Sequence, residues 1–382
     1  MAEPHSAQLL HTPLHALHRE LGARLVPFAG YDMPVQYPAG IIAEHLHCRA
    51  AAGLFDVSHM GQVTLTGPDA AAALETLVPG DITGLAAGHT RYTLFTDETG
   101  GILDDLMVSN AGDPDHLFLV VNAACKAEDV AHLRRHIGRT IEIRELTDRA
   151  LLALQGPRAG AVMARLAPDA VAMNFMTFGR ASIGGIPCWL TRSGYTGEDG
   201  FELSVAAEAA EKLARLLLSQ PEVKPIGLGA RDSLRLEAGL CLYGHDIDRS
   251  TTPVEAGLAW VIGKRRREAG GFPGDAVVRR QLAEGTQRRR VGIRPDGAAP
   301  AREQTAIVDA GGATLGVITS GGYGPSVGGP VAMGYVAAGS TAEGTPVGLV
   351  VRGQNRPAKI VKLPFVPHRY HKAPGRDVPG TG

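Results

Sequence analysis

The sequence of 382 residues has only four cysteines, 5% aromatic residues and almost no net charge. The cysteines lie far apart with no CxxC pair. This argues against a disulfide framework and predicts reduced, mostly buried thiols in a cytosol-like compartment. A formal net charge of -1 gives no electrostatic case for binding nucleic acid or an anionic membrane. We therefore expect a cytoplasmic protein whose partners are small molecules or other proteins.

Several sequence signals that would define other classes are also missing. No apolar run approaches the roughly 20 residues of a membrane span, and the N-terminal stretch lacks the features of a signal or transit peptide. His45, His47 and Cys48 lie close together, but no second ligand cluster follows, so we expect no metal site. There is no GxSxG or HExxH motif, and the glycine-rich stretch 321–325 lacks the spacing of a dinucleotide fingerprint.

The chain does contain a repeated pattern of strand, Gly-Pro corner and helix. A strand pattern at 62–66 precedes Gly67-Pro68, and a second at 150–154 precedes Gly156-Pro157. Each corner is followed by a helical pattern, the second at 158–166. The repeat predicts two related α+β subdomains, and a prior of about 100–200 residues per domain allows two or three domains in total.

The C-terminal part has a different texture, with short strand patterns separated by glycines. These patterns lie at 291–293, 305–308, 315–320, 331–336, 346–351 and 358–363. Such spacing predicts a separate small β-barrel or sandwich. We therefore assign residues 1–280 to the two α+β subdomains, 287–370 to an all-β domain and 371–382 to a tail without an assigned function.

Local patterns predict further elements. Thr12 is expected to cap a helix that has Pro13 at its first position. Residues 25–37 are rich in turn formers and aromatics and predict an irregular wall or loop. A hairpin is expected over 92–109, with its turn at 97–100. Further helices are predicted at 41–52, 126–136, 206–218 and 227–240.

Two adjacent acids, Asp104 and Asp105, interrupt an apolar strand pattern. Side chains alternate between the faces of a strand, so these two must point to opposite sides. A carboxylate that faces a covered site must be paired, bonded or functional, because its burial is costly. The sequence alone leaves open whether the pair works in chemistry or only caps a turn.

Two further stretches offer groups that suit a ligand. The loop 192–203 places Tyr195 and Glu198 among three glycines, and such an acid would accept hydrogen bonds from a pterin or guanine edge. An ordinary β-turn loop is the alternative. Arg231 and Arg235 lie near a helix start, where the arginine fork fits a ligand carboxylate, although ion pairing on a solvated face is more common.

Taken together, these stretches resemble the T-protein family of the glycine cleavage system, the aminomethyltransferases, from about Thr12 to Tyr370. The resemblance rests on seven motifs in family order: Phe28-Ala29-Gly30 with 33–37, 54–60, 101–106, 151–157, 194–200, 230–240 and Pro364-Phe365-Val366-Pro367. It implies a three-domain cloverleaf with folate in a central hole. It also implies transfer of a one-carbon unit from the aminomethylated lipoyl arm of H-protein to tetrahydrofolate, which yields 5,10-methylenetetrahydrofolate and ammonia.

The resemblance also implies roles for individual residues. Asp105 matches the catalytic acid, whose ionised form would stabilise the iminium character of the transferred carbon. Glu198 matches the pterin-binding acid and Arg231 a folate-site arginine. The remaining matched positions line the pocket: Tyr92, Tyr195, Tyr243, Met60, Asn122 and Tyr370.

Two other functions stay open at this point. One is a folate-dependent demethylase of the same fold, and the other is a non-catalytic folate-binding relative, which should lack the acid at position 105. The basic runs 264–267 and 288–290 suit a solvated face, with steering of an acidic carrier protein as the alternative.

Overall fold

The five-stranded sheet that carries the paired acids is antiparallel throughout. The structure is a computed structural model that describes residues 8–113 and 116–372. This sheet has the order β5-β6-β7-β4-β8. Its strands are β4 (Gly61–Thr66), β5 (Thr90–Thr96), β6 (Ile102–Asp113), β7 (His116–Val121) and β8 (Glu142–Glu145). Two helices, α3 (Ala70–Glu75) and α4 (Lys126–Ile137), pack on one face around Leu74, Leu106 and Leu133.

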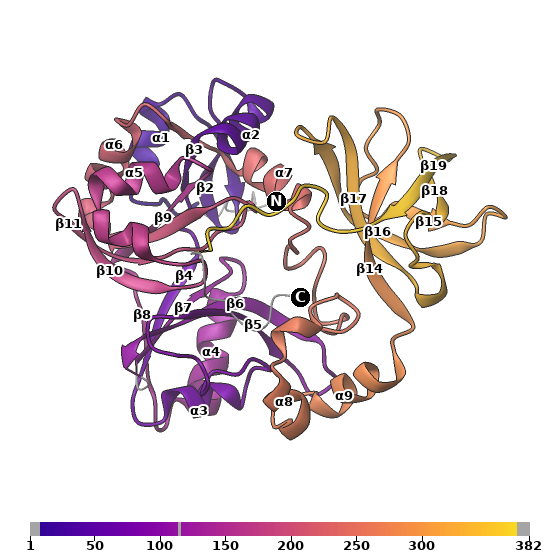
Figure 1. Cartoon of the computed structure of the whole chain (residues 1–382), viewed down its shortest axis with the longest axis horizontal. Coiled ribbons are helices and arrows are strands. Elements are labelled where there is room, and N and C mark those ends of the chain that lie inside the picture. The colour runs from indigo at the N-terminus through magenta and orange to yellow at the C-terminus, as the bar shows by residue number, and fades with distance from the viewer. Residues whose placement is uncertain (1–7, 114–115, 373–382) are drawn as a thin grey trace, which may run out of the picture.

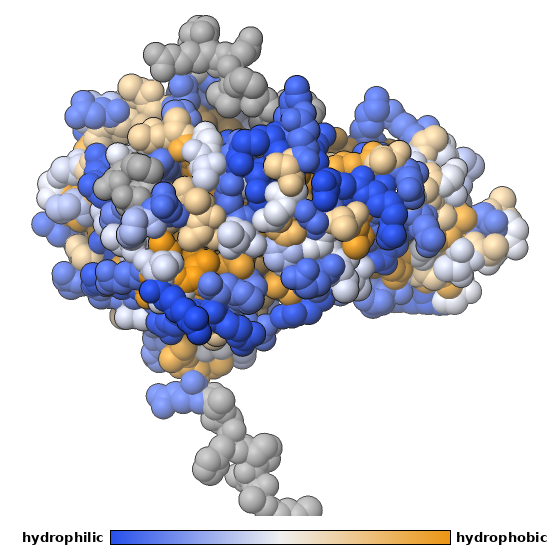
Figure 2. Space-filling view, turned by 90° about the horizontal axis from the view of Figure 1, so that it is seen from below, coloured by the Kyte–Doolittle hydropathy of each residue, from blue (hydrophilic) through white to orange (hydrophobic). Residues whose placement is uncertain are grey.

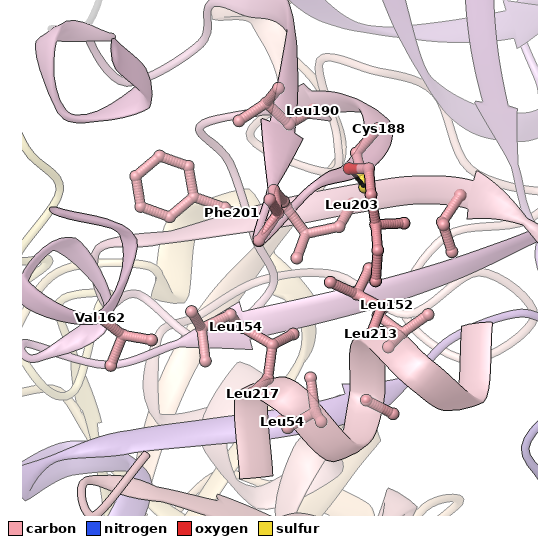
Figure 3. Close-up of a cluster of buried hydrophobic side chains, with 14 of the residues drawn as sticks. Leu54, Leu152, Leu154, Val162, Cys188, Leu190, Phe201, Leu203, Leu213 and Leu217 are labelled. Atoms are coloured by element: carbon pink, nitrogen blue, oxygen red, sulfur yellow. Dashed lines mark hydrogen bonds between the residues drawn. The ribbon is translucent and has the colours of Figure 1, made fainter. Parts of the chain in front are cut away.

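A second sheet of six strands has the order β10-β11-β12-β9-β3-β13. Its strands are β3 (Ala52–Asp56), β9 (Arg149–Gln155), β10 (Phe178–Ile183), β11 (Ile186–Thr191), β12 (Gly200–Ala206) and β13 (Val223–Pro225). The outer face is covered by α1 (His15–Glu20), α5 (Ala159–Leu166) and α6 (Ala210–Leu218). Figure 3 shows the resulting core, in which Leu152 and Leu154 of β9 lie among Val162, Leu213 and Leu217.

The two sheets face each other across a shared apolar layer. Alternation along β9 sends Leu151 and Ala153 away from the helices and toward Phe118 and Val120 of β7. Phe55 and Phe178 fill the same layer, and all six side chains are buried. Each sheet therefore has one face on helices and one on the other sheet, and polar side chains on these inner faces are brought together.

The predicted strand–corner–helix repeat is present in both sheets. Gly67 follows β4 with φ +146° and Gly156 follows β9 with φ +133°, a region that only glycine occupies easily. A Cβ on Gly156 would lie 2.3 Å from the carbonyl oxygen of Ala51, so the corner also requires the missing side chain. The sequence prediction of two related α+β units is confirmed.

The N-terminal region corrects two expectations. Residues 25–37 form a hairpin, β1 (Arg24–Phe28) and β2 (Tyr31–Gln36), because Ala29 and Gly30 both take positive φ and make the two-residue turn that hairpins favour. Thr12 is not a helix cap. Its hydroxyl instead donates to the buried carboxylate of Asp56 at 2.6 Å, and α1 begins at His15.

The predicted small β domain is a closed barrel with the order β14-β17-β16-β15-β18-β19. Its strands are β14 (Arg288–Pro295), β15 (Ala306–Val308), β16 (Thr314–Gly324), β17 (Gly329–Ala337), β18 (Pro346–Val351) and β19 (Gln354–Val361). The remaining helices are α2 (Ile41–Ala50), α7 (Leu228–Glu237), α8 (Lys264–Ala269) and α9 (Asp275–Glu284), with 3-10 turns at Pro168–Ala172, Ala207–Ala209, Ala259–Val261 and Ala338–Ser340. The three lobes surround a central region (Figure 1).

Several arginines of the two basic runs contact other parts of the protein, so these runs are not simply solvated faces. Arg265 pairs with Asp81, Arg266 donates to the carbonyl of Glu75 at 2.6 Å, and Arg290 donates to that of Ala256 at 2.8 Å. These arginines fasten α8 and the start of the barrel to the rest of the molecule.

The face of the molecule in Figure 2 is mostly hydrophilic, with hydrophobic residues in separate small patches. No helix in the described ranges combines the length and apolar character that crossing a bilayer requires.

Candidate active site

The acid pair on β6 points to opposite faces of the five-stranded sheet, as the alternation predicted. Asp104 is completely buried on the helix-covered face, together with Leu106 and Val108. Asp105 lies on the inner face and stays partly exposed, next to its cross-strand partner Leu94 of β5. The acid that the resemblance selected is therefore the one on the inner face.

Asn122, at the end of β7, holds both acids. Its Nδ2 donates to Asp105 Oδ1 at 2.7 Å, to Asp104 Oδ1 at 2.9 Å and to the Asp105 carbonyl at 3.1 Å. Its backbone N–H donates to Asp104 Oδ2 at 3.1 Å. The carboxylates are thus fixed by a neutral donor, which orients Asp105 without cancelling its charge.

The electrostatics around Asp105 favour its protonated form. Burial, together with the nearby charge of Asp104, raises the pKa of Asp105 to about 7. Behind Asp104 lies a third carboxyl, Asp129 of α4, whose pKa is raised to about 10 by burial and by the charge of Asp104. The protonated form of Asp129 is therefore favoured, and in that form it can donate a hydrogen bond to Asp104. Three adjacent acids then carry fewer than three charges.

Aromatic side chains and one arginine complete the inner-face cluster. Tyr92 lies close enough to Asp105 to counteract part of the rise in its pKa, and the Tyr92 ring stacks on Trp260 with centroids 5.5 Å apart. The Arg231 guanidinium lies 4.8 Å from the centroid of the Tyr195 ring. Within 8–113 and 116–372, no side chain or carbonyl accepts a hydrogen bond from this guanidinium, so its donors are available to a ligand.

Glu202 of β12 belongs to the same inner face, although the sequence did not single it out. It pairs with Ala153 of β9, whose side chain lies in the layer between the sheets. Its Oε2 accepts from Ser193 Oγ at 2.9 Å, and among the charged groups its carboxylate is the main one that favours the charged form of Arg231. Glu202 therefore offers a carboxylate beside Arg231 and Tyr195.

Glu198 lies in a different ionic network, in which Glu198 and Arg49 are buried and Arg369 is about half exposed. Its Oε1 accepts from Arg49 Nη1 and from Arg369 Nη2, both at 2.7 Å, while its Oε2 is buried without a partner in the described ranges. Arg49 of α2 also contacts Glu237 of α7 at 3.1 Å. Tyr370 lies near this network and stacks on Phe175 at 3.9 Å. The structure thus brings Glu198 and Tyr370 together, but not with Asp105.

Two predicted lining residues lie beside the Asp105 cluster. Tyr243 packs in the same apolar cluster as Tyr92 and donates to the Ile102 carbonyl at 3.4 Å. Met60 packs against the same apolar layer as Met107, which follows Asp105 on the same face of β6. Both lie at the edge of the inner-face cluster.

Several contributing residues carried too weak a sequence signal to be found. Asp129 lies inside a helix next to its one other acid, the exposed Glu128, and Trp260 lies on a short 3-10 turn. Arg49 is an ordinary helical arginine by pattern. Alternation along β12 could have flagged Glu202. Its neighbours Phe201 and Leu203 face the helix-covered core, so Glu202 between them must face the layer between the sheets.

Comparisons with known proteins place the chain in one family. Residues 14–266 match the GCVT N-terminal domain, and residues 288–367 match the glycine cleavage T-protein C-terminal barrel domain. The mitochondrial aminomethyltransferase of Dictyostelium discoideum is 46% identical over 385 residues, covering 96% of this chain and 95% of its own. The mitochondrial aminomethyltransferase of Gallus gallus is 48% identical, covering 96% and 94%.

A solved structure agrees with these sequence matches. The crystal structure of glycine cleavage system aminomethyltransferase T from Bartonella henselae superposes with a TM-score of 0.89 at 43% identity, covering 96% of this chain and 100% of that one. The matches define a folate-dependent one-carbon transferase. The chain belongs to the glycine cleavage T-protein family, the aminomethyltransferases. The predicted family, fold class, enzyme class and one-carbon acceptor, tetrahydrofolate, are confirmed.

Proposed function

We propose that this chain transfers the aminomethyl carbon of a lipoylated H-protein to tetrahydrofolate, with Asp105 as the catalytic acid. The observation that carries the proposal is the position of Asp105 on the inner sheet face, where Asn122 Nδ2 holds its carboxylate at 2.7 Å. This carboxylate is oriented, partly exposed and uncompensated by any cation that contacts it in the described ranges. Such a group is suited to stabilising a developing positive charge.

The proposed reaction balances in bonds and in protons. The transferred carbon starts bonded to sulfur and to an amine nitrogen, and it ends bonded to N5 and N10 of tetrahydrofolate. The bonds to sulfur and to nitrogen break, and the two folate N–H protons pass to them, giving the dihydrolipoyl thiol and ammonia. Ionised Asp105 stabilises the iminium character of the carbon and accepts one of these protons. A pKa of about 7 suits a group that takes and releases a proton near neutral pH.

Substrate recognition is proposed for the groups around Asp105. The unpaired guanidinium of Arg231 fits the carboxylates of the folate glutamate. Glu202 offers an acceptor for the amino and ring N–H groups of the pterin. Glu198 was expected in that role, but its contacts with Arg49 and Arg369 favour a structural one. Tyr92, Tyr195 and Tyr243 supply flat apolar surface for the ring system.

The test mixes the purified chain with aminomethylated H-protein and tetrahydrofolate, and follows methylenetetrahydrofolate and ammonia. Asp105→Asn should bind tetrahydrofolate with a similar Kd but lose most turnover, by about 10²-fold or more, since it removes the charge and keeps the shape. Glu98→Gln, an exposed change on the same hairpin, is the control and should keep full activity. Full turnover in Asp105→Asn would refute its role, and no product with the wild type would refute the transfer itself.

We also propose a cytoplasmic location, as the sequence suggested. It is supported by four free cysteines, three of them buried, which suit a reducing compartment. The relatives from Dictyostelium discoideum and Gallus gallus are called mitochondrial, and a direct measurement distinguishes the two locations. Cell fractionation of the source organism, followed by immunoblotting of this chain, should show it in the cytoplasmic fraction.

A further inference from the structure

Two histidines and a carboxylate meet beside the N-terminal hairpin, outside the active-site cluster. His11 precedes α1, His15 is the first residue of α1, and Asp32 lies on β2. One donor atom from each side chain lies within 4.8 Å of the other two. His15 Nε2 is 2.9 Å from Asp32 Oδ2, and the rings of His11 and His15 stack at 3.7 Å with an interplanar angle of 3°.

The main chain holds these three residues in register. The N–H of Leu10 donates to the Gly30 carbonyl, and the N–H of Asp32 donates to the Leu10 carbonyl, both at 2.9 Å. The segment before α1 therefore runs beside β2 as a short parallel bridge, which places His11 next to Asp32. A turn with His15 N–H bonded to the Thr12 carbonyl at 3.1 Å brings His15 back over His11. The cluster does not depend on the flexible ends of long side chains.

We propose that His11, His15 and Asp32 form a binding site for a divalent transition-metal ion of the zinc class. Tetrahedral Zn²⁺ with bonds of about 2.0–2.2 Å needs its donors about 3.4 Å apart, and the donors here lie within 4.8 Å of one another, so the exposed His11 ring has to turn out of its stack on His15 to bind the ion. A donor set of two imidazole nitrogens and one carboxylate oxygen favours Zn²⁺, Ni²⁺ or Cu²⁺ over Mg²⁺ and Ca²⁺, because the latter two prefer ligands that are all oxygen. Water would take the fourth position.

The surroundings of the cluster allow an ion to enter and give it a structural effect. His11 is exposed, and the side chains of His15 and Asp32 keep 14% and 24% of their surface accessible. A bound ion would join the segment before α1 to β2 through three coordinate bonds. It would thereby fasten the hairpin whose Tyr31 hydroxyl accepts a hydrogen bond from Lys126 of α4 at 2.6 Å. Without the ion, His15 and Asp32 are joined directly by a hydrogen bond.

The test titrates the tag-free, chelator-treated full chain with ZnCl₂ by calorimetry, with MgCl₂ in parallel. The expected result is one Zn²⁺ per chain, no Mg²⁺ binding, and a higher Tm with Zn²⁺. Co²⁺ in place of Zn²⁺ should give the intense visible absorption of a four-coordinate ion. Asp32→Asn and the double variant His11→Ala/His15→Ala should each lower Zn²⁺ affinity by about tenfold or more, because even loss of an outer-shell group costs that much.

The matched control is His132→Ala/His136→Ala, which removes a second close histidine pair, with ring centroids 4.6 Å apart on α4. This variant should bind Zn²⁺ as the wild type does. The proposal is overturned if the wild type binds no Zn²⁺, if the His11/His15 variant binds it unchanged, or if only the α4 variant loses it. Activity is not the readout, so the result is independent of the proposed transfer reaction.

Discussion

At the scale of single residues, the site depends on which of two neighbouring acids faces inward. Alternation along a strand predicted that Asp104 and Asp105 separate, and the structure shows Asp104 among the helices and Asp105 on the inner face. The clamp by Asn122 and the proton on Asp129 come from β7 and α4, and neither contact follows from local pattern. Local sequence therefore gives the direction of a side chain, whereas its partners depend on the assembled sheet.

The raised pKa of Asp105 predicts the pH dependence of the reaction. The carboxyl is neutral below its pKa of about 7 and anionic above it, so kcat/KM should rise with pH through 7 and fall about tenfold per unit below it. The profile is measured with saturating H-protein and varied tetrahydrofolate. Asp104→Asn removes one cause of the shift and should move the midpoint to lower pH. A midpoint near 7 that persists in Asp105→Asn would assign the titration to another group.

The two glutamates near the loop 192–203 should respond differently to loss of charge. Glu202→Gln should raise the KM for tetrahydrofolate and leave Tm nearly unchanged, because Glu202 is partly exposed and, in the part of the chain that the structure describes, its side chain is hydrogen-bonded only to Ser193. Glu198→Gln should lower the free energy of unfolding by about 3 kcal/mol, because it leaves two arginines against a buried neutral group. Steady-state kinetics and urea denaturation measure both. The reverse pattern would make Glu198 the pterin acid.

At the scale of elements, patterns with a clear turn signal were predictable and those without one were not. The Gly-Pro corners after β4 and β9 marked both strand–helix units, and the glycine-separated strands marked the barrel. The β1–β2 hairpin escaped prediction because Pro27 and Pro34 interrupt its strand pattern. Its turn also uses Ala29 at positive φ, a conformation that sequence does not announce for alanine.

The corner after β9 should be intolerant of any side chain. Gly156→Ala would place a Cβ 2.3 Å from the Ala51 carbonyl oxygen and 2.6 Å from that of Cys48, at φ +133°. We expect a loss of about 3 kcal/mol or more in the free energy of unfolding, measured by urea denaturation. Gly185→Ala is the matched control, since it also has positive φ but no atom within 4 Å of a Cβ, and should cost only about 1 kcal/mol. Equal costs would show that the corner has room.

At the scale of the whole molecule, buried polar groups join the barrel to the other lobes. Asp246 accepts from Arg235 of α7 at 2.7 Å, from Thr319 and from Ser320 of β16 at 2.8 Å, and its carbonyl accepts from Tyr335 of β17 at 2.7 Å. The barrel itself was predictable from sequence. This joint was not, because its hydrogen-bonded partners lie up to 89 residues apart and their patterns are those of ordinary polar residues.

Loss of the Asp246 charge should therefore weaken the attachment of the barrel. Within the described ranges, Asp246→Asn leaves the buried Arg235 with one charged partner, the exposed Asp232, and should cost about 3 kcal/mol. Urea unfolding followed by circular dichroism and by calorimetry should show a lower midpoint or two separate transitions. Asp296→Asn, an exposed change on the barrel, should leave the wild-type curve unchanged. An unaltered curve in Asp246→Asn would mean that the joint contributes little.

The order of the strands has a consequence for deletions in the gene. β3 and β9 are antiparallel neighbours, with Asp56 opposite Leu152, and the whole five-stranded lobe lies in the chain between them. The five-stranded lobe (the guest) is thus inserted between two paired strands of the six-stranded lobe (the host). The two ends of the guest therefore lie close together. Asp105, Asn122 and Tyr92 belong to the guest, whereas Arg231 and Glu202 belong to the host. A single deletion between positions 56 and 152 would remove the reactive acid while leaving the host with ends close enough to rejoin, and neither part would retain a complete site.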